Sequence, residues 1–398
     1  MPSQIIKVLH VIPSVSLVHG GPTHALNTIE RALTNNGIDV TTLTTDDDGP
    51  QCRLALSAQP DRTNNARRVY FRKQSDFYKV ALGVIPWLWR NVHTFDAIHI
   101  HGLFSFTSIV AGYIARIRGI PYVVRPLGTL ADYGQKTHRP TLKKLSLAVL
   151  EGPILSSAYA VHFTSENERT EAEAIVANLS GIVIPLGIEM TDPDPSTSKK
   201  PERPVAATDA AIHLLFLSRI HPKKNIEGLL HAIAAIVAEG SHLRLDIAGE
   251  GSPDYVHKLQ KLAATLGLQE RIFWLGHVDG PQKAATFATA DIYLLPSFSE
   301  NFGIAAAEAM AAGKACILGS GVAIGADAAR CGAALLVEPE PEHIAAALRR
   351  LLHNKKARLA MGTAANSHAR RMFSTDLMAH RMAALYDKMA ASNRAVRP

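Results

Sequence analysis

Aromatic residues, cysteines and long apolar runs are all scarce in this 398-residue sequence. Phe, Trp and Tyr make up only 6% of it while Ala, Leu and Ile are abundant, which favours helices packed on buried sheets over an all-β fold. The three cysteines, Cys52, Cys316 and Cys331, form no close pair, so we expect a reducing, cytoplasmic compartment. No run of about 18 apolar residues occurs, which argues against a membrane-spanning helix. The apolar run at residues 5–12 predicts a first strand rather than a signal peptide.

The length and composition are those of a large folded protein with an excess of positive charge. At about 150 residues per domain, the length predicts two or three domains. Hydrophobic residues form 47% of the chain and charged residues 19%, which excludes disorder as its main state. The net charge of +7 suits an anionic partner such as a nucleotide or a phospholipid headgroup. Nucleic acid is disfavoured, because the sequence contains no recognition-helix motif and no basic sheet studded with aromatic residues.

Apolar runs of strand length alternate with helical segments in both halves. In the first half we expect strands at 5–12, 39–44, 97–101, 122–125, 158–164 and 182–186, with helices at 23–36 and 109–118. In the second half, strands at 212–217, 243–248, 272–275, 292–295 and 314–318 alternate with helices at 226–238, 256–266, 281–288 and 304–312. This alternation predicts right-handed crossovers and two α/β domains, each with a doubly wound parallel sheet.

A polar, proline-rich stretch separates the two halves. Residues 190–210 contain four prolines and are predicted to be a linker. We therefore expect one Rossmann-like domain over residues 1–189 and a second over residues 211–372. The amphipathic tail, residues 373–398, either completes the second domain or returns to the first. Open parallel sheets bind ligands beyond the carboxyl ends of their strands, so motifs at strand exits are the candidate sites.

The strongest candidate site follows the expected strand at 292–295. A polar loop, residues 300–303, leads into an Ala-rich helix that begins near Ile304 and contains Glu308. The free N–H groups and positive dipole end of such a helix attract phosphate. Glu300 and Glu308 would lie about 10 Å apart. They could therefore accept hydrogen bonds from hydroxyls on either side of a phosphate bound at the helix start. Alternatively, Glu300 caps the helix and Glu308 is a half-buried side chain with a polar partner, although a charge on so apolar a helix is costly.

Two cations and a glycine turn follow other strands of the second half. Arg219 and Lys224 bracket a short turn and could hold a diphosphate, the arginine as a fork and the lysine as a point charge. Two solvated surface side chains are the alternative. Gly249 and Glu250 begin a tight turn after the next strand, but its glycines are too few for a dinucleotide fingerprint.

Glycines and histidines mark two strand exits in the first half. Gly20 and Gly21 let the backbone approach a ligand closely, or simply form a connecting turn. His99 and His101 lie on one face of a strand end, because side chains alternate. A polar or catalytic contact by His101 is favoured over a metal pair, since no further ligand stands at a suitable spacing, and a structural role is the alternative. Residues 46–48, three aspartates, are discounted as a metal motif because they are not expected to follow a strand directly.

Two basic segments of the first half suggest contact with a membrane surface. Arg67, Arg68, Arg72 and Lys73 lie upstream of the aromatic segment 87–90, and Lys136, His138, Arg139, Lys143 and Lys144 flank the apolar stretch 145–150. Basic segments next to aromatic or amphipathic ones can lie on an anionic bilayer. We therefore expect peripheral contact with the inner face of a membrane, a solvated charged face being the alternative.

Together these motifs resemble those of the retaining, nucleotide-sugar-dependent glycosyltransferases of the group 1 or GT4 type, which have the GT-B fold. The resemblance spans nearly the whole chain, and its most specific part is the pair Glu300 and Glu308, separated by seven residues and preceded by Pro-Ser-x-Ser. It implies two Rossmann-like domains that face each other across a cleft, with the donor in the C-terminal domain and the acceptor mainly in the N-terminal one. It also implies that the C-terminal helix returns to the first domain.

The resemblance assigns roles to the motif residues. Glu300 would bind hydroxyls of the donor sugar, Glu308 would bind ribose hydroxyls, and His101 would lie near the reacting centre. Arg219 and Lys224 would clamp the diphosphate. The other donor-side residues that it implies are Gly20, Gly21, Gly249, Glu250, Asn301, Phe302, Gly303 and Ile304. The sequence departs from the family pattern at Leu127, where many relatives carry His or Arg before the glycine.

The resemblance implies a retaining glycosyltransferase that moves a hexose-type sugar from a nucleoside-diphosphate sugar to a hydroxyl of a glycan or lipid-linked acceptor. Such an enzyme would serve the synthesis of a cell-surface polysaccharide or glycolipid. No metal and no other cofactor is expected, because the cations and the helix N-terminus can stabilise the departing diphosphate. A nucleotide-sugar epimerase, a phosphorylase and a non-catalytic sugar-nucleotide-binding protein are the alternatives.

Overall fold

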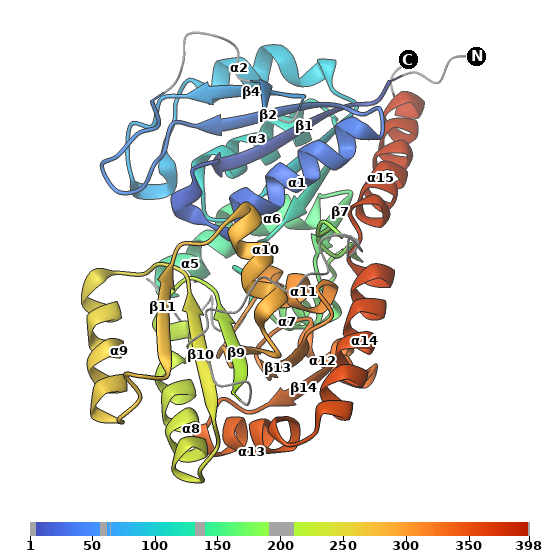
Figure 1. Ribbon diagram of the computed structural model, residues 1–398. Coiled ribbons are helices and arrows are strands. Elements are labelled where there is room, and N and C mark those ends of the chain that lie inside the picture. The colour runs from blue at the N-terminus through green and yellow to red at the C-terminus, as the bar shows by residue number, and fades with distance from the viewer. Residues whose placement is uncertain (1–4, 56–61, 64, 132–139, 191–210, 397–398) are drawn as a thin grey trace. The chain divides into compact units, whose positions relative to one another are not determined.

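The computed structural model describes residues 5–55, 62–63, 65–131, 140–190 and 211–396. The chain forms two compact units, unit 1 with residues 1–187 and 375–398, and unit 2 with residues 188–374. Each unit is a sheet covered by helices, which confirms the predicted pair of Rossmann-like α/β domains (Figure 1). Nearly all of the predicted linker, residues 191–210, lies outside the described residues.

Unit 1 contains an eight-stranded sheet in the order β3-β4-β2-β1-β5-β6-β7-β8. The strands are β1 (Lys7–Ser14), β2 (Asp39–Thr45), β3 (Arg62–Thr63), β4 (Ala66–Phe71), β5 (Ala97–His101), β6 (Tyr122–Arg125), β7 (Ala160–Phe163) and β8 (Gly181–Val183). The helices are α1 (Gly21–Asn35), α2 (Val84–Asn91), α3 (Phe106–Ile117), α5 (Pro140–Ser146), α6 (Gly152–Ser156), α7 (Glu166–Ile175) and α15 (Thr375–Val396). Short helical turns lie at η1 (Leu17–His19), η2 (Phe77–Lys79), η3 (Val92–Thr94) and η4 (Leu147–Glu151). Every strand pair is parallel except β3 with β4.

The central strands of unit 1 bury both of their faces. Leu9 and Val11 of β1 point into an apolar core shared with α2 and α3, while the alternate residue His10 points to the opposite face. On that opposite face α1 and α15 lie side by side (Figure 1). The C-terminal helix therefore packs on unit 1, one of the two placements that the sequence left open.

Unit 2 contains a six-stranded, fully parallel sheet in the order β11-β10-β9-β12-β13-β14. The strands are β9 (Ile212–Leu217), β10 (Leu243–Ala248), β11 (Ile272–Gly276), β12 (Ile292–Leu295), β13 (Ala315–Gly319) and β14 (Ala334–Val337). The helices are η5 (Pro222–Lys224), α8 (Ile226–Ala238), α9 (Pro253–Thr265), α10 (Gly280–Thr289), α11 (Ile304–Ala311), α12 (Gly325–Arg330), α13 (Pro341–Leu352) and α14 (Lys355–Met372).

In unit 1, strands β1–β4 form one half of the sheet and β5–β8 the other half, so the direction in which the sheet grows changes between the neighbours β1 and β5. In unit 2 the direction changes in the same way between β9 and β12. At such a point the loops after the two neighbouring strands diverge to opposite faces and leave a crevice between them, which is where open α/β sheets bind ligands. The loops after these four strands are therefore the expected places for a site.

One interpretation of the aspartates at 46–48 was wrong, because β2 ends at Thr45 and these residues follow it directly. Asp47 is buried and accepts hydrogen bonds from Lys73 Nζ at 2.7 Å and Lys79 Nζ at 2.8 Å. His19 contacts the other carboxylate oxygen of Asp47 at 2.7 Å. These partners stabilise the charged carboxylate and hold the pKa of Asp47 below its usual value despite its burial. The described partners of the Asp47 carboxylate are thus two lysines and a histidine of neighbouring segments.

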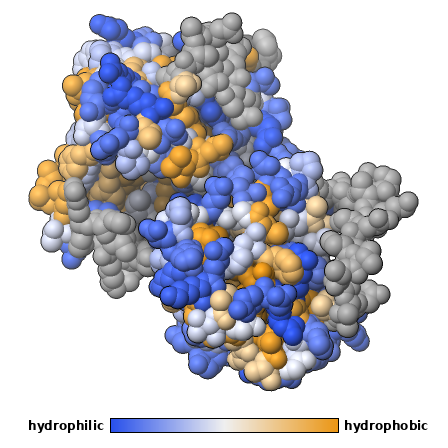
Figure 2. Space-filling model, turned by 60° about the vertical axis from the view of Figure 1, so that its left-hand side comes forward, coloured by the Kyte–Doolittle hydropathy of each residue, from blue (hydrophilic) through white to orange (hydrophobic). Residues whose placement is uncertain are grey.

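Hydrophobic side chains reach the surface of both units (Figure 2). Among the residues that the structure describes, no helix is both long enough and apolar enough to cross a bilayer.

Candidate active site

The loops after β9 and β12 bring together Lys224 and Glu300, which lie far apart in the sequence. Lys224 ends the short helix η5, and its buried ammonium group donates to Oε1 of Glu300. Ser297 Oγ donates to the same oxygen at 3.1 Å. Both contacts use Oε1, and Oε2 of Glu300 has no side-chain partner among the residues that the structure describes.

The backbone holds Glu300 in place through the loop after β13. Its N–H donates to the carbonyl oxygen of Gly321 at 2.8 Å, and Ala323 N–H donates to its carbonyl oxygen at 3.2 Å. A Cβ atom at Gly321 would stand 2.1 Å from the carbonyl oxygen of Phe298, so only glycine permits the two loops to approach this closely. The carboxylate thus sits on a loop pinned from both sides.

Glu308 lies one helix turn inside α11 and does have a polar partner, Lys283 of α10. Lys283 Nζ donates to Oε1 of Glu308 at 2.6 Å, and both side chains are partly exposed. Burial raises the pKa of the Tyr293 phenol on β12, and the charges of Glu300 and Glu308 add to that effect. Glu300 lies in the loop after β12 and Glu308 in the helix that follows this loop, so both carboxylates belong to one loop-and-helix segment of unit 2.

The N-terminus of α11 lies between these carboxylates. Gly303 is the N-cap with φ +91°, a left-handed conformation that favours glycine, and it provides no side chain to cap the helix. The first N–H groups of a helix point out from its end and attract anions. Phe302 is buried and packs edge-on against Phe373 at 5.3 Å, so its side chain belongs to the core and its backbone is the part that can face a ligand.

The turn that carries Arg219 is packed tightly against the glycine turn after β10. A Cβ atom at Gly249, where φ is +135°, would stand 1.9 Å from the carbonyl oxygen of Ser218. Ile220 N–H donates to the carbonyl oxygen of Glu250 at 2.7 Å. The glycine therefore permits loop-to-loop packing, and the side chains of Arg219 and Glu250 are left exposed.

In unit 1, Gly20 and Gly21 lie at the corresponding position after β1. Gly20 has φ +64° and is the N-cap of α1, and Gly21 is the first residue of that helix. The helix again has no side-chain cap, but Pro22 has no N–H, and the N–H groups of Thr23 and His24 donate to the carbonyl oxygen of Gly20 at 3.1 and 3.2 Å.

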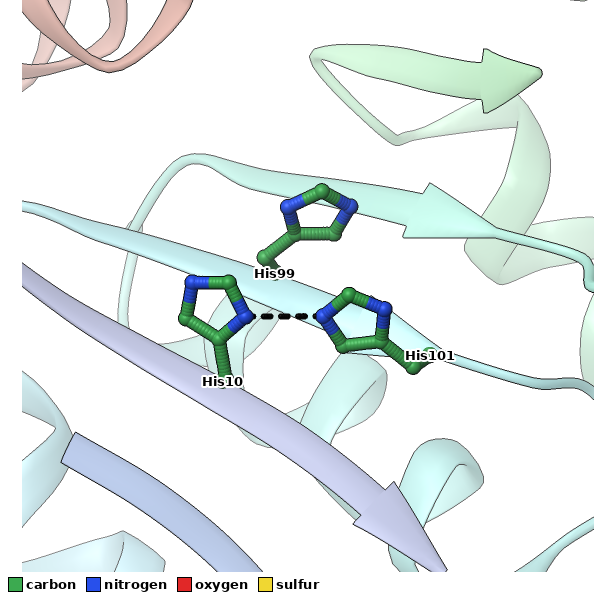
Figure 3. Close-up of side chains that lie close together, drawn as sticks. All are labelled: His10, His99 and His101. Carbon is green, nitrogen blue, oxygen red and sulfur yellow. Dashed lines mark hydrogen bonds between the residues drawn. The ribbon is translucent and has the colours of Figure 1, made fainter. Parts of the chain in front are cut away.

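His101, the last residue of β5, belongs to a buried cluster of histidines that sequence reasoning did not foresee. The parallel register of β1 and β5 places His10 beside His99, and the three side chains group together (Figure 3). His10 Nδ1 lies 2.8 Å from His101 Nε2. His162 of β7 extends the cluster, with its Nδ1 3.2 Å from His99 Nε2.

One backbone carbonyl determines the protonation of this cluster. His162 Nε2 lies 2.8 Å from the carbonyl oxygen of Ile184, so Nε2 carries the proton and Nδ1 accepts from His99. His99 Nδ1 is then an acceptor and receives the hydroxyl proton of Tyr386 at 2.7 Å. The chain of neutral imidazoles thus ties helix α15 to the sheet.

The remaining hydrogen bonds of the histidine cluster follow from the same rule, that a neutral imidazole has one donor nitrogen and one acceptor nitrogen. The Tyr386 oxygen, having donated to His99, is free to accept from His10 Nε2 at 3.5 Å. His10 Nδ1 then accepts from His101 Nε2, and His101 Nδ1 remains a bare, buried acceptor without a described partner. The opposite assignment would bury an unpartnered N–H of His101, which costs more than an unpartnered lone pair.

The ligand atoms of His10, His99 and His101 all lie within 4.8 Å of one another, so a third imidazole does accompany the pair noted in the sequence. The hydrogen bonds among the described residues use all the ring nitrogens of these three histidines except His101 Nδ1, which keeps a free lone pair. Burial and the positive charge of Arg125 lower the pKa of His10 to about 3. A nearby guanidinium also disfavours a second cation, so the arrangement is that of a neutral hydrogen-bond network.

Comparison with known proteins decides the family. Residues 199–368 match the model of "Glycosyl transferases group 1", and residues 20–187 match that of a "Glycosyl transferase 4-like domain". The D-inositol 3-phosphate glycosyltransferase of Corynebacterium glutamicum is 30% identical over 329 residues, which are 78% of this chain and 76% of that protein. The chain belongs to the group 1 glycosyltransferases. The enzyme of the same name from Geodermatophilus obscurus is 29% identical over 76% of this chain and 69% of its own.

Solved structures show that this glycosyltransferase has the GT-B fold. Anabaena Alr3699/HepE, crystallised with UDP and glucose, superimposes with a TM-score of 0.75 at 18% identity over 96% of this chain and 100% of its own. Sucrose-phosphate synthase from Thermosynechococcus elongatus superimposes with a TM-score of 0.77 at 19% identity over 97% of this chain and 100% of its own.

Sequence reasoning missed the partners of the site residues. Lys283 was not singled out, although it is the cation that contacts Glu308. Its position in an expected helix gave no sign of the contact, because the pairing depends on how α10 and α11 pack. His10 could have been found, since it lies in the first strand at a position whose side chain alternates with apolar residues.

Proposed function

We propose that this glycosyltransferase moves a hexose-type sugar from a nucleoside-diphosphate sugar to a hydroxyl of a glycan or lipid-linked acceptor, with retention of the anomeric configuration. The observation that carries the proposal is the convergence of Lys224, Glu300, Glu308 and the N-terminus of α11 at the switch point of unit 2. The UDP and glucose bound to Anabaena HepE, which has the same fold, support this class of donor.

The chemistry of the donor explains why cations and carboxylates are both needed. When the bond from the anomeric carbon to the phosphate oxygen breaks, negative charge grows on the diphosphate and positive charge on the sugar ring. Lys224, Arg219 and the first N–H groups of α11 are the groups that stabilise the diphosphate in this proposal, so it requires no metal ion. Oε2 of Glu300 binds sugar hydroxyls, and Glu308 binds the ribose.

Gly20, Gly21 and His101 complete the proposed roles from unit 1. The two glycines allow the backbone to approach the diphosphate, and Nδ1 of His101 accepts a hydrogen bond from a substrate hydroxyl near the reacting centre. Synthesis of a surface polysaccharide or glycolipid at the inner face of a membrane is the setting that we propose for this reaction.

The decisive experiment is a donor screen. The protein is incubated with UDP-, GDP- and ADP-sugars, with and without membrane glycolipid, and release of nucleoside diphosphate is measured. A transferase releases it in an acceptor-dependent manner, an epimerase returns an isomerised donor without acceptor, and a binding protein turns over neither. Proton NMR of the product linkage shows retention or inversion, and chelation by EDTA tests the metal independence.

Glu300→Gln tests the site itself. The amide keeps the size of the side chain but removes the charge, so we expect loss of at least about 100-fold in kcat. Glu239→Gln is the matched control, because Glu239 forms an exposed ion pair with Arg349 elsewhere in unit 2. Turnover of Glu300→Gln at the level of this control would refute the site.

A further inference from the structure

The outer helices of unit 1 expose large apolar side chains. Ile85 and Trp89 of α2 are 42% and 46% exposed, and Ile117 at the end of α3 is 67% exposed. Leu145 of α5 and Val149 of η4 are 62% and 57% exposed. Single exposed apolar residues are ordinary on protein surfaces, but a group of them needs an explanation.

Direct contacts join these helices into one layer. The guanidinium of Arg118 donates to the carbonyl oxygen of Trp89 at 2.8 Å and lies 4.4 Å from the centre of that indole ring. The Tyr113 hydroxyl donates to the carbonyl oxygen of Val149 at 3.3 Å. Helix α3 therefore lies between α2 and η4, and we call this surface the α2–α3–η4 face.

The charge on this face has one sign. Arg90, Arg116, Arg118 and Lys144 are exposed on the helices that form this face or at their ends. The only acidic residue within 84–95, 106–121 and 140–159 is Glu151, which is 1% exposed and accepts a hydrogen bond from Ser146 Oγ at 2.7 Å. The described face thus presents apolar groups and cations but no carboxylate, a combination that suits an anionic bilayer and would repel a basic partner.

The structure also shows which of the basic residues predicted from the sequence to contact a membrane are buried. Arg68 is buried and paired with both carboxylate oxygens of Glu30, so it cannot reach a membrane. Lys73 is likewise buried against Asp47 and Asp76. The first basic segment predicted from the sequence therefore loses two of its cations, while Lys136, His138 and Arg139 of the second lie outside the described residues.

We propose that the α2–α3–η4 face docks on the surface of an anionic lipid bilayer. Ile85, Trp89, Ile117, Leu145 and Val149 enter the interface between headgroups and acyl chains, and the four cations lie at the level of the headgroups. The proposal deepens the proposed function and rests on it, because a face that docks unit 1 on a membrane would bring it to a lipid-linked acceptor.

Vesicle co-sedimentation of the full chain tests the docking. We expect binding to vesicles of phosphatidylglycerol and phosphatidylcholine, and little binding to phosphatidylcholine alone. Each cation near an anionic surface strengthens binding about fivefold. Arg116→Glu/Lys144→Glu should therefore weaken it by about 25-fold or more, and raising salt from about 0.1 M to about 1 M should weaken wild-type binding, because the Debye length falls from about 10 Å to about 3 Å.

Unit 2 offers matched controls for both the apolar side chains and the cations of this face. Leu359 of α14 is 63% exposed, close to the value for Ile117, and Lys355 and Lys356 are exposed near it. We expect Ile117→Ser to weaken binding several-fold and Leu359→Ser to leave it unchanged. Lys355→Glu/Lys356→Glu should weaken binding far less than the pair of substitutions on the face.

Two outcomes would overturn the proposal. One is equal loss in the unit 1 and unit 2 variants, which would show general basicity rather than a docking face. The other is no binding to anionic vesicles at low salt, which would leave a protein partner as the occupant of the face. Nucleoside-diphosphate release in the absence of vesicles separates this test from that of the proposed function, because the surface variants should retain wild-type release.

Discussion

The buried histidine chain predicts that unit 1 loses stability steeply in weak acid. The perturbation is a shift from pH 7 to pH 5. The groups that make stability depend on pH are imidazoles that are neutral in the folded protein. Burial, with the charge of Arg125, lowers the pKa of both His10 and His162 to about 3. Burial also lowers the pKa of His99 and His101 well below the usual value. All four imidazoles resist the proton that they would accept in the unfolded chain.

The sign follows from linkage. A folded-state pKa below the unfolded value of about 6.5 means that the unfolded chain binds more protons, so stability is complete above that value and falls as the pH drops toward about 3. From pH 7 to pH 5 each such histidine lowers the free energy of unfolding by about 2 kcal/mol. His10 and His162 together contribute about 4 kcal/mol, a large part of the stability of a domain, and His99 and His101 act in the same direction. Burial raises the pKa of Glu168, so at this group the folded state binds more protons than the unfolded chain and its contribution opposes that of the histidines.

Tryptophan fluorescence can follow unit 1 by itself. The chain has Trp87 and Trp89 in unit 1 and Trp274 in unit 2, so Trp274→Phe confines the signal to unit 1. Urea unfolding of this variant at several pH values gives the slope of stability against pH. His162→Gln keeps a donor for the carbonyl of Ile184 and removes one titrating group, so the slope between pH 6 and pH 4 should fall by up to about 1.4 kcal/mol per pH unit.

His93→Gln is the control, because His93 is an exposed histidine of η3 in unit 1 and lies outside the buried histidine cluster. We expect this variant to have the wild-type slope. A flat profile between pH 6 and pH 4, or equal slopes for the two variants, would refute the assignment of neutral, buried imidazoles.

Two further predictions concern packing in each unit. Gly249→Ala should lower the free energy of unfolding of unit 2 by several kcal/mol, as measured by urea unfolding. Gly240→Ala, at a left-handed position with open space around it, should lower it by about 1 kcal/mol. Equal losses in the two variants would contradict the packing argument. Arg68→Met leaves Glu30 buried without its partner and should destabilise unit 1 by about 3–5 kcal/mol. Adding Glu30→Leu should recover most of that loss, and failure to recover would mean that shape rather than charge dominates there.

The fold could be predicted because its evidence is local in the sequence. Alternating apolar runs and helical periods indicate a parallel sheet wherever they occur, and the linker at 190–210 separates two such series. Some elements were missed, among them β4 and α2. The strand Ala66–Phe71 contains adjacent arginines, one of which is buried through its ion pair with Glu30, so its pattern is not that of an apolar strand.

The sequence could indicate candidate site residues only where one motif contains them together. The spacing of Glu300 and Glu308 in one loop and helix is such a case, and so is the turn from Arg219 to Lys224. The contact between Lys224 and Glu300 spans 76 residues and arises because β9 and β12 are neighbours at the switch point. Contacts of this kind depend on strand order, which a single sequence does not contain.

The pairing of Lys224 with Glu300 has a consequence for the order of events on the donor. Both side chains are largely buried, and each neutralises the other while the site is free. If the diphosphate takes Lys224 as its partner, Glu300 is released from that ion pair at the moment when the sugar hydroxyls arrive. Binding of the diphosphate and orientation of the sugar are then coupled through one lysine.

This coupling predicts opposite effects of one substitution on binding and on transfer. Glu300→Gln removes the carboxylate that competes for Lys224, so the affinity for the released nucleoside diphosphate, measured by calorimetry, should rise about fivefold, the equivalent of about 1 kcal/mol, although transfer is lost. Lys224→Met is the complementary variant and should weaken that affinity by at least about tenfold, because a buried carboxylate would then face the diphosphate alone. Weaker binding to Glu300→Gln than to the wild type would show that Glu300 supports the diphosphate instead of competing with it, and the coupling would have to be abandoned.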